Sequence, residues 1–189
     1  MLQSPPAAPD QSNAVRPTRP IVLVGLMGVG KSTVGRRLAA RLDLPFADAD
    51  HEIEVAADMT VSEIFERYGE AYFRDGERRV IARLLDGEPK VIATGGGAFI
   101  QEPTRARILE SAIAVWLDAD VDILADRVQR RDTRPLLKGN DPLAKLGELA
   151  AVRNPLYALA PIHIRSGRGP HEATVDAIIA ALGANGSTK

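Results

Sequence analysis

Residues 25–32, with the sequence GLMGVGKS, match the pattern G-x-x-x-x-G-K-[ST] and precede Thr33. Glycines at this spacing let backbone N–H groups converge on phosphate oxygens, and the start of a helix adds positive potential. Lys31 would reach the β- and γ-phosphates of a nucleotide, and the Ser32 hydroxyl would ligate Mg²⁺. The loop follows an apolar run and precedes an amphipathic segment, the context in which this motif binds nucleotides. The expected nucleotide contacts are Gly28, Val29, Gly30, Lys31, Ser32 and Thr33.

Two carboxylates, Asp48 and Asp50, follow a short apolar run as D-A-D. Along an extended segment, a spacing of two places both side chains on the same side. Near a triphosphate, one carboxylate can hold Mg²⁺ through water and the other can accept a proton from an attacking hydroxyl. For either residue alone, capping of the helix that follows is the alternative role.

Arg74 and Glu77 are three residues apart in a segment with helical patterning, so they share one face of that helix. They would form an exposed ion pair, or Glu77 would orient Arg74 toward a substrate carboxylate. The run Gly95-Gly96-Gly97 follows an apolar strand. It would let a ligand approach the backbone closely, with a flexible turn as the alternative.

Strands and helices must alternate to position these residues. Apolar runs predict strands at 21–24, 44–47, 91–94, 113–117 and 162–164. Helical spacing predicts helices at 31–42, 50–57, 61–68, 70–86, 103–111, 120–130, 142–158 and 171–182. This order predicts an α/β fold in which helices cover both faces of a parallel sheet. Ligands of such sheets bind at the carboxyl ends of the strands, where the loops above lie.

The composition restricts the class of protein. The chain has 189 residues, 45% of them hydrophobic, which is enough for one domain with a full core. Its 24 basic and 25 acidic residues balance, which argues against a general nucleic-acid binder. No apolar run approaches the roughly 18 residues that cross a bilayer, and no basic segment precedes an apolar one at the N-terminus. We therefore expect a cytoplasmic protein without a membrane partner. The absence of cysteine excludes a thiol nucleophile.

Residues 1–19 contain four prolines and almost no large apolar side chains. Such a segment cannot bury enough surface to offset the entropy lost on ordering, so we expect a disordered tail. The ordered domain is expected to span residues 20–184.

A phosphate loop alone does not separate kinases from GTPases. GTPases carry a D-x-x-G switch and an N-K-x-D motif that reads the base. In this sequence no Asp is followed three residues later by Gly, and no Asn precedes a Lys. The GTPase interpretation is therefore disfavoured.

From about residue 20 to 182 the chain resembles the shikimate kinase family. The resemblance rests on six elements in order: GLMGVGKSTVGRRLA, F-A-D-A-D-x-x-I-E, Y-F-R-x-x-E, T-G-G-G, Arg134-Pro135-Leu136-Leu137 and Arg153-Asn154-Pro155-Leu156-Tyr157. It implies a three-layer P-loop kinase fold with a five-stranded parallel sheet and a mobile lid at about 131–142. It also implies ATP-dependent phosphorylation of the 3-hydroxyl of shikimate, in aromatic amino acid biosynthesis, with Mg²⁺ as cofactor.

The same resemblance implies roles for single residues. Asp50 is similar to the carboxylate that binds the substrate hydroxyls and takes the proton, and Asp48 to the carboxylate on the Mg²⁺ side. Arg74 and Arg153 resemble the pair that binds the substrate carboxylate. The backbone contacts to substrate would come from Gly96 and Gly97.

On the nucleotide side, Arg134 resembles the lid arginine that neutralises the transferring phosphoryl group. Arg127 is similar to the arginine that stacks on adenine, and Pro170 would flank the other side of the base. Asp118 follows an apolar run, a position typical of a metal-binding carboxylate. We rank it below Asp48 for metal, because the resemblance gives it no such role.

Two other functions stay open at this point. One is a related small-molecule kinase, such as a gluconate kinase. The other is a nucleotide-binding regulatory module that has lost catalysis. For either kinase, the expected partners are ATP and a small hydroxy acid, and the expected state is a monomer.

Overall fold

A computed structural model describes residues 16–129 and 141–186 of the chain. Its five strands form one parallel sheet in the order β2-β3-β1-β4-β5. The sheet has a continuously apolar centre, as parallel strands covered on both faces require. The strands are β1 (Ile21–Val24), β2 (Phe46–Asp48), β3 (Val91–Ala93), β4 (Ile113–Asp118) and β5 (Ile162–Arg165). The predicted α/β fold with a five-stranded parallel sheet is confirmed.

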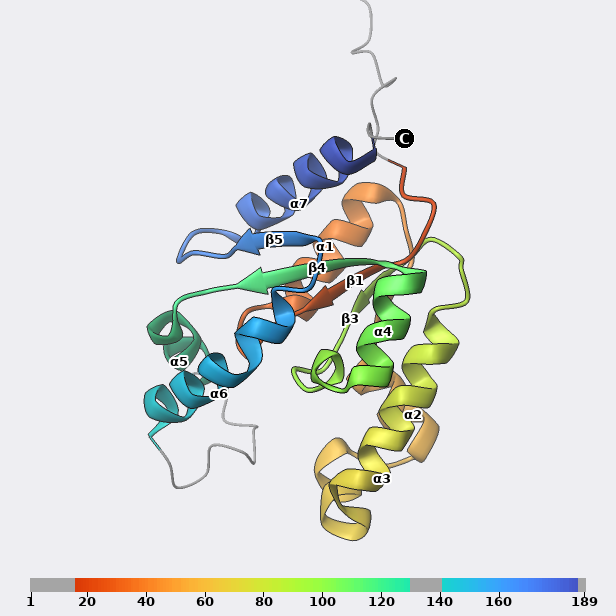
Figure 1. The fold of residues 1–189 in the computed structure, drawn as a ribbon, viewed down its shortest axis with the longest axis vertical. Helices are drawn as coiled ribbons and strands as arrows, with labels where there is room; N and C mark the ends of the chain where they lie inside the picture. Colours follow the sequence, from red (N-terminus) through yellow and green to blue (C-terminus); the bar gives the residue numbers. More distant parts are fainter. Residues whose placement is uncertain (1–15, 130–140, 187–189) are drawn as a thin grey trace, which may run out of the picture.

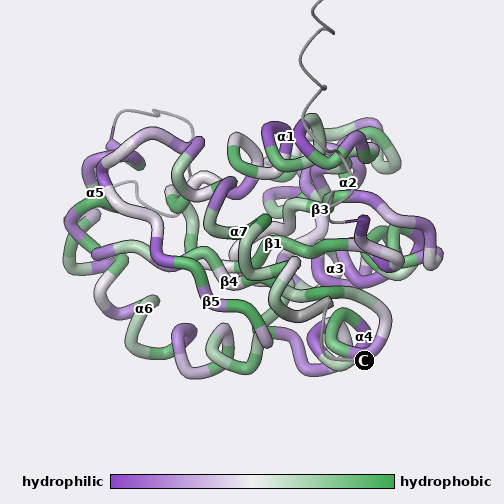
Figure 2. The backbone as a smooth tube through the Cα atoms, turned by 90° about the horizontal axis from the view of Figure 1, so that it is seen from above, coloured by the Kyte–Doolittle hydropathy of each residue, from purple (hydrophilic) through white to green (hydrophobic). Residues whose placement is uncertain are grey.

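Helices cover both faces of this sheet (Figure 1). Helices α1 and α7 pack together, and α1 also contacts β3, whereas α4 contacts β4 and α6 contacts the short η1. From above, α1 lies on one side of the strands and α4 and α6 lie on the other (Figure 2). The helices are α1 (Lys31–Leu42), α2 (Ala49–Ala57), α3 (Val61–Leu84), η1 (Ala98–Ile100), α4 (Glu102–Ser111), α5 (Val121–Gln129), α6 (Pro142–Tyr157) and α7 (His171–Gly186).

The neighbouring strands β1 and β3 continue into helices on opposite faces of the sheet. From β1 the chain passes through α1 to the edge strand β2, and from β3 it passes through α4 to β4 on the other side of β1. Both crossovers are right-handed by the usual rule, so the loops after β1 and β3 diverge and leave a crevice between them. The crevice lies at the carboxyl ends of the strands.

Helices α2 and α3 form a small unit beside the main core. Their contact buries a separate apolar cluster made of Ile53, Ile64, Phe73 and Val80. Gly69, with φ of 78°, interrupts α3. The two helices predicted at 61–68 and 70–86 are thus the two parts of α3.

Helix starts show how the loops are held. Asp48 caps α2, Thr60 and Glu63 form a capping box at α3, and Asp141 caps α6. Helix α1 is different, since its N-cap is Gly30 and no side chain accepts from its first N–H groups. The start of α1 therefore offers backbone donors to an external anion.

The structure describes only part of two predicted segments. Of the predicted tail, residues 16–19 are described, and Arg19 donates to the carbonyl of Glu110 at 3.4 Å. Residues 1–15 and 130–140 lie outside the described residues, and with them Arg134 and all of the predicted lid at 131–142 except its last two residues. Within residues 16–129 and 141–186, no helix combines the length and apolarity needed to cross a membrane.

Candidate active site

The phosphate loop, residues 25–32, has a backbone that requires glycine. Gly25, Gly28 and Gly30 have φ values of 138°, 83° and 99°, which L side chains rarely adopt. A Cβ on Gly28 would lie 2.8 Å from the Val128 side chain, and one on Gly25 would collide with the carbonyl of Leu117. The loop thus packs tightly against β4 and α5, while Gly28 and Gly30 line a polar cavity.

Lys31 is fixed by the loop that it follows. Its side chain is buried, and Nζ donates to the carbonyls of Gly25 at 2.7 Å and Leu26 at 2.9 Å. These bonds hold the ammonium group over the loop. The buried positive charge is a preorganised partner for phosphate oxygens.

Asp48 uses both carboxylate oxygens. Oδ2 accepts from the Ser32 hydroxyl at 2.5 Å, and Oδ1 accepts from the Asp50 backbone N–H at 3.2 Å. Asp48 therefore caps α2 and also contacts the serine of the phosphate loop, so the two roles do not exclude each other. Among the described residues, no group of three or more His, Cys, Asp or Glu side chains is arranged to hold a metal. Ser32 and Asp48 would nevertheless suit Mg²⁺. This ion keeps several water ligands and takes the rest from one or two side-chain oxygens and from phosphates.

Asp50 lies in the first turn of α2 and not on an extended segment. The predicted reason for its alignment with Asp48 is therefore wrong, since a strand-like alternation does not apply to it. Both residues nevertheless line one polar cavity of about 320 Å³. The other residues lining this cavity are Gly28, Gly30, Lys31, Ser32, Thr33, Arg36, His51, Glu54, Thr94, Gly95 and Gly96.

The turn Gly95-Gly96-Gly97 is the meeting point of the predicted side chains. A Cβ on Gly95 would lie 2.7 Å from Oδ1 of Asp50, and one on Gly97 would collide with the guanidinium of Arg74. On Gly96 it would lie 3.5 Å from the backbone nitrogen of Met27 and 3.6 Å from Nη1 of Arg153. None of the three glycines has a positive φ. A Cβ would be crowded at Gly95 and Gly97, whereas at Gly96 it would make only ordinary van der Waals contacts.

Arg74 forms a close ion pair with Glu77. Nη1 lies 2.8 Å from Oε2 of Glu77, and Nη2 lies 3.2 Å from the exposed Glu70. The Glu77 side chain is only 2% exposed, so the pair is not the surface pair of the alternative interpretation. Burial raises the pKa of Glu77, although the Arg74 charge opposes this effect. The guanidinium is thus aimed at the glycine turn by a buried carboxylate.

Arg153, on α6, reaches the same turn from the opposite side. Its Nη1 donates to the carbonyl of Gly96 at 3.3 Å. The Tyr157 hydroxyl, one helical turn later, donates to the same oxygen. We call Asp50, Arg74, Glu77, Arg153 and the turn 95–97 the acceptor cluster. Of this cluster, Asp50, Gly95 and Gly96 line the polar cavity. The two arginines do not line it, but they contact the glycine turn.

Arg127 lies on the other side of the phosphate loop. It donates to the carbonyl of Val29 at 3.3 Å and to that of Gly167 at 2.7 Å. Burial, and to a lesser degree Arg168, lowers its pKa. Pro170 is exposed in the same loop after β5. The two residues predicted to flank adenine thus lie beside the loop that would hold the phosphates.

Asp118 does not line the polar cavity. Its carboxylate lies 3.3 Å from His163 Nε2 and 3.6 Å from Arg165 Nη1, both on β5. The ring of His163 stacks on Trp116 with centroids 4.0 Å apart. These contacts connect β4 to β5, so they account for a carboxylate at the end of β4 without a role in metal binding.

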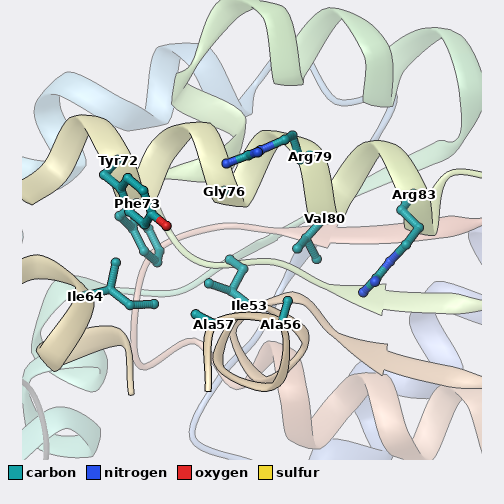
Figure 3. A pocket seen from close by; sticks show the side chains of 10 residues that line it. All are labelled: Ile53, Ala56, Ala57, Ile64, Tyr72, Phe73, Gly76, Arg79, Val80 and Arg83. Atoms are coloured by element: carbon teal, nitrogen blue, oxygen red, sulfur yellow. The ribbon is translucent and has the colours of Figure 1, made fainter. Parts of the chain in front are cut away.

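A second hollow, of about 400 Å³, lies between α2 and α3 and is mainly apolar. Figure 3 shows Ile53 and Phe73 directed into it from the two helices. Arg79 and Arg83 also line it, and they pair with Asp75 and Glu52. None of the predicted site residues that the structure describes lines this hollow, so it is separate from the polar cavity.

Sequence reasoning gave no role to Arg36, His51 or Glu54, which line the polar cavity, or to Tyr157. For Tyr157 a signal existed, because residues four apart on a helix share a face and Arg153 was already a candidate. The same spacing relates Arg36 to Ser32 on α1 and Glu54 to Asp50 on α2, whereas His51 carries no such signal. Arg36 lies over the ring of Phe46, a contact between α1 and β2 that only the fold brings about.

Comparisons with known proteins agree with this geometry. A family model described as shikimate kinase matches residues 27–183. A shikimate kinase from Zymomonas mobilis is 58% identical over 164 residues, which cover 87% of this chain and 93% of that protein. A solved shikimate kinase from Acinetobacter baumannii in complex with shikimate superposes with a TM-score of 0.86 at 38% identity, covering 93% of this chain and 98% of the other.

A gluconokinase from Sinorhizobium meliloti shares the fold at greater distance. Its TM-score is 0.61 at 20% identity, with 90% of this chain and 94% of the other covered. At this identity the likeness concerns the fold alone. The family match and the identity to the Zymomonas mobilis protein extend over most of the chain. The chain belongs to the shikimate kinase family.

Proposed function

We propose that the chain transfers the γ-phosphoryl group of ATP to the 3-hydroxyl of shikimate. The observation that carries this proposal is the convergence of the phosphate loop, Asp50, Arg74 and Arg153 on the turn 95–97. An anionic hydroxy acid can approach a triphosphate only if cations bind both anions. Phosphoryl transfer then needs positioning and charge stabilisation more than covalent chemistry from the protein.

In the acceptor cluster, Arg74 and Arg153 bind the substrate carboxylate from two sides of the turn. Asp50 accepts a hydrogen bond from the substrate hydroxyl and takes its proton as the oxygen attacks phosphorus. The backbone of Gly96 and Gly97 contacts the ring of the substrate. The collisions expected of any Cβ on Gly95 and Gly97 support this close approach.

On the donor side, Lys31 and the N–H groups of the phosphate loop bind the β- and γ-phosphates. Arg127 and Pro170 flank the adenine, next to Val29 and Gly167. Arg134, outside the described residues, neutralises charge on the transferring group when the lid segment closes. Closure would also exclude water and suppress ATP hydrolysis.

We further propose that Ser32 and Asp48 hold Mg²⁺, Asp48 through water. The ion would neutralise charge on the β- and γ-phosphates. Ser32→Ala should raise the Mg²⁺ concentration needed for half-maximal activity roughly tenfold, because one oxygen ligand is lost. A magnesium titration at saturating ATP and shikimate measures this, with Ser62→Ala on α3 as control. Equal magnesium requirements in both variants would contradict the assignment.

A coupled assay of ADP release tests the function directly, with shikimate and gluconate as separate acceptors. We expect turnover with shikimate and little with gluconate, because the paired arginines and Asp50 suit a ring that carries both a carboxylate and hydroxyls. The absence of shikimate turnover would overturn the proposal. Binding of ATP and shikimate without product would favour the regulatory module.

We also propose a monomer in the cytoplasm that acts on small molecules and binds neither nucleic acid nor membranes. The phosphate loop, Asp50, Arg74 and Arg153 meet within one copy of the chain, so a second copy is not needed to bring them together. Sedimentation of the protein at assay concentration tests this, and a dimer mass would contradict it.

A further inference from the structure

Tyr157 is a buried residue at the end of α6 whose hydroxyl contacts both the glycine turn and Arg153. The residue is completely buried, and its ring lies near those of Phe99 and Trp116, with centroids 6.4 and 6.2 Å apart. The hydroxyl donates to the carbonyl oxygen of Gly96. The aromatic contacts explain why the ring is buried, but they do not require a hydroxyl.

The Gly96 carbonyl accepts from two side chains of one helix. Arg153 Nη1 donates to it at 3.3 Å, and Tyr157, four residues later, donates from the same face of α6. A carbonyl oxygen has two lone pairs, so both donors can be accommodated. One oxygen therefore links the glycine turn to α6 and to the arginine that α6 carries.

The hydroxyl stays a donor at every pH of interest. Burial raises the pKa of Tyr157 to about 12, although the neighbouring charge of Arg153 opposes this effect. The contact to Gly96 is therefore maintained regardless of the acid–base chemistry at Asp50. A permanent neutral donor suits a structural link beside a reacting centre.

We infer that Tyr157 is a positioning residue for the phosphoryl acceptor. By holding the Gly96 carbonyl, it fixes the turn that substrate contacts, and it lets Arg153 direct its remaining N–H groups to the substrate carboxylate. Without the hydroxyl, Arg153 is the remaining side-chain donor to this carbonyl, and its guanidinium shifts toward the turn. This inference rests on the proposed function, since it concerns the same acceptor.

The test compares Tyr157→Phe with Tyr68→Phe, a matched change at an exposed tyrosine on α3. Removing the buried hydroxyl should raise the KM for shikimate about tenfold, while kcat and the KM for ATP stay within about threefold. Tyr68→Phe should leave all three constants unchanged. A purely structural role would lower stability or activity without separating the two substrates. An equal change in both KM values, or no change, would overturn the inference.

A second measurement asks whether Tyr157 acts through Arg153. Shikimate binding is titrated in the wild type, in each single variant and in Tyr157→Phe combined with Arg153→Ala. We expect the effect of Tyr157→Phe to shrink to less than about threefold once Arg153 is absent, because the two residues share one task. Fully additive effects would contradict the coupling. If the wild type does not phosphorylate shikimate, the proposed function fails, whereas normal wild-type turnover with an unaffected Tyr157→Phe variant rejects only this inference.

Discussion

The phosphate loop and the acceptor cluster bind different anions, and they are built in different ways. The loop is local: eight consecutive residues set its shape, and Lys31 is held by carbonyls five and six residues away. The acceptor cluster is assembled from α2, α3, α6 and the turn after β3, and Arg153 lies 57 residues from the carbonyl that it contacts. A short loop can preorganise a site for phosphate, whereas recognition of a particular acceptor needs the whole fold.

The two regions meet at Gly96, which faces both. A Cβ there would lie 3.5 Å from Met27 N in the phosphate loop and 3.6 Å from Arg153 in the acceptor cluster. Changes in the cluster should therefore alter acceptor binding and chemistry, and leave nucleotide binding nearly intact. The following variants test this separation.

Asp50→Asn should have the largest effect. Loss of the proton acceptor should lower kcat by about a hundred- to ten-thousand-fold, while the affinity for ATP stays nearly unchanged. Asp58→Asn, at the other end of α2, is the matched control and should behave like the wild type. Steady-state kinetics and nucleotide titrations measure both quantities. If Asp50→Asn keeps activity within a few-fold of wild type, Asp50 is not the base.

Arg74→Ala should chiefly weaken shikimate binding, by about 100-fold, because a charge-assisted contact is lost and buried Glu77 is left without its partner. Arg78→Ala removes an exposed arginine of the same helix and should change binding little. Calorimetric titration with shikimate, with and without ATP, compares the two. A similar loss of ATP affinity in Arg74→Ala would break the separation between the two regions.

Gly97→Ala should raise the KM for shikimate roughly tenfold, because the added methyl must displace the Arg74 guanidinium. The backbone of Gly97 lies in the right-handed helical region, so alanine causes no strain of its own. Gly76→Ala is the matched control, since nothing lies within 4 Å of the added Cβ and the site is helical. If the two variants have the same KM for shikimate, space at Gly97 is not what positions Arg74.

The smallest expected effect is a pH dependence of stability. Because burial raises the pKa of Glu77, the folded state holds this proton more tightly than the unfolded chain does. The resulting stabilisation is complete below the ordinary pKa of the group and is lost as the pH rises through the raised value. The Tm advantage of the wild type over Glu77→Gln should therefore shrink as the pH rises above the ordinary pKa of a glutamate.

The Tm advantage of the wild type over Asp75→Asn should change with pH in the opposite direction. A hydrogen bond from Arg78 lowers the pKa of the exposed Asp75, so its contribution is present at higher pH and is lost as the pH falls. A Tm advantage over Glu77→Gln that grew with pH would show that the Arg74 charge, and not burial, dominates at Glu77.

The division between the two regions also explains which structural features could be predicted from the sequence. The phosphate loop, the strand–helix alternation and the break at Gly69 depend on local spacing, and they were predicted from it. The pairing of Arg74 with Glu77 was also accessible, since it is an i,i+3 relation on one helix. The i,i+4 relations of Arg36 to Ser32 and of Glu54 to Asp50 were accessible too, but the enclosure of these residues and His51 in one cavity depends on packing between elements.

Two cases show where local reasoning gave an incomplete answer. The end of β2 lies at Asp48, so Asp50 belongs to a helix, and its position beside Asp48 follows from the cap and not from strand alternation. The glycine turn suggested a close ligand approach. The side chains around it belong to Asp50, Arg74, Glu77, Arg153 and Tyr157. They come from distant segments, so the sequence alone could not assign them to single glycines.

The most direct test of the account is a crystal structure of the protein with ADP, Mg²⁺ and shikimate. We predict that the shikimate carboxylate contacts Arg74 and Arg153 and that its 3-hydroxyl lies within hydrogen-bond distance of Asp50, facing the β-phosphate across the Gly96 turn. Shikimate bound away from this turn, for instance in the apolar hollow between α2 and α3, would contradict the account.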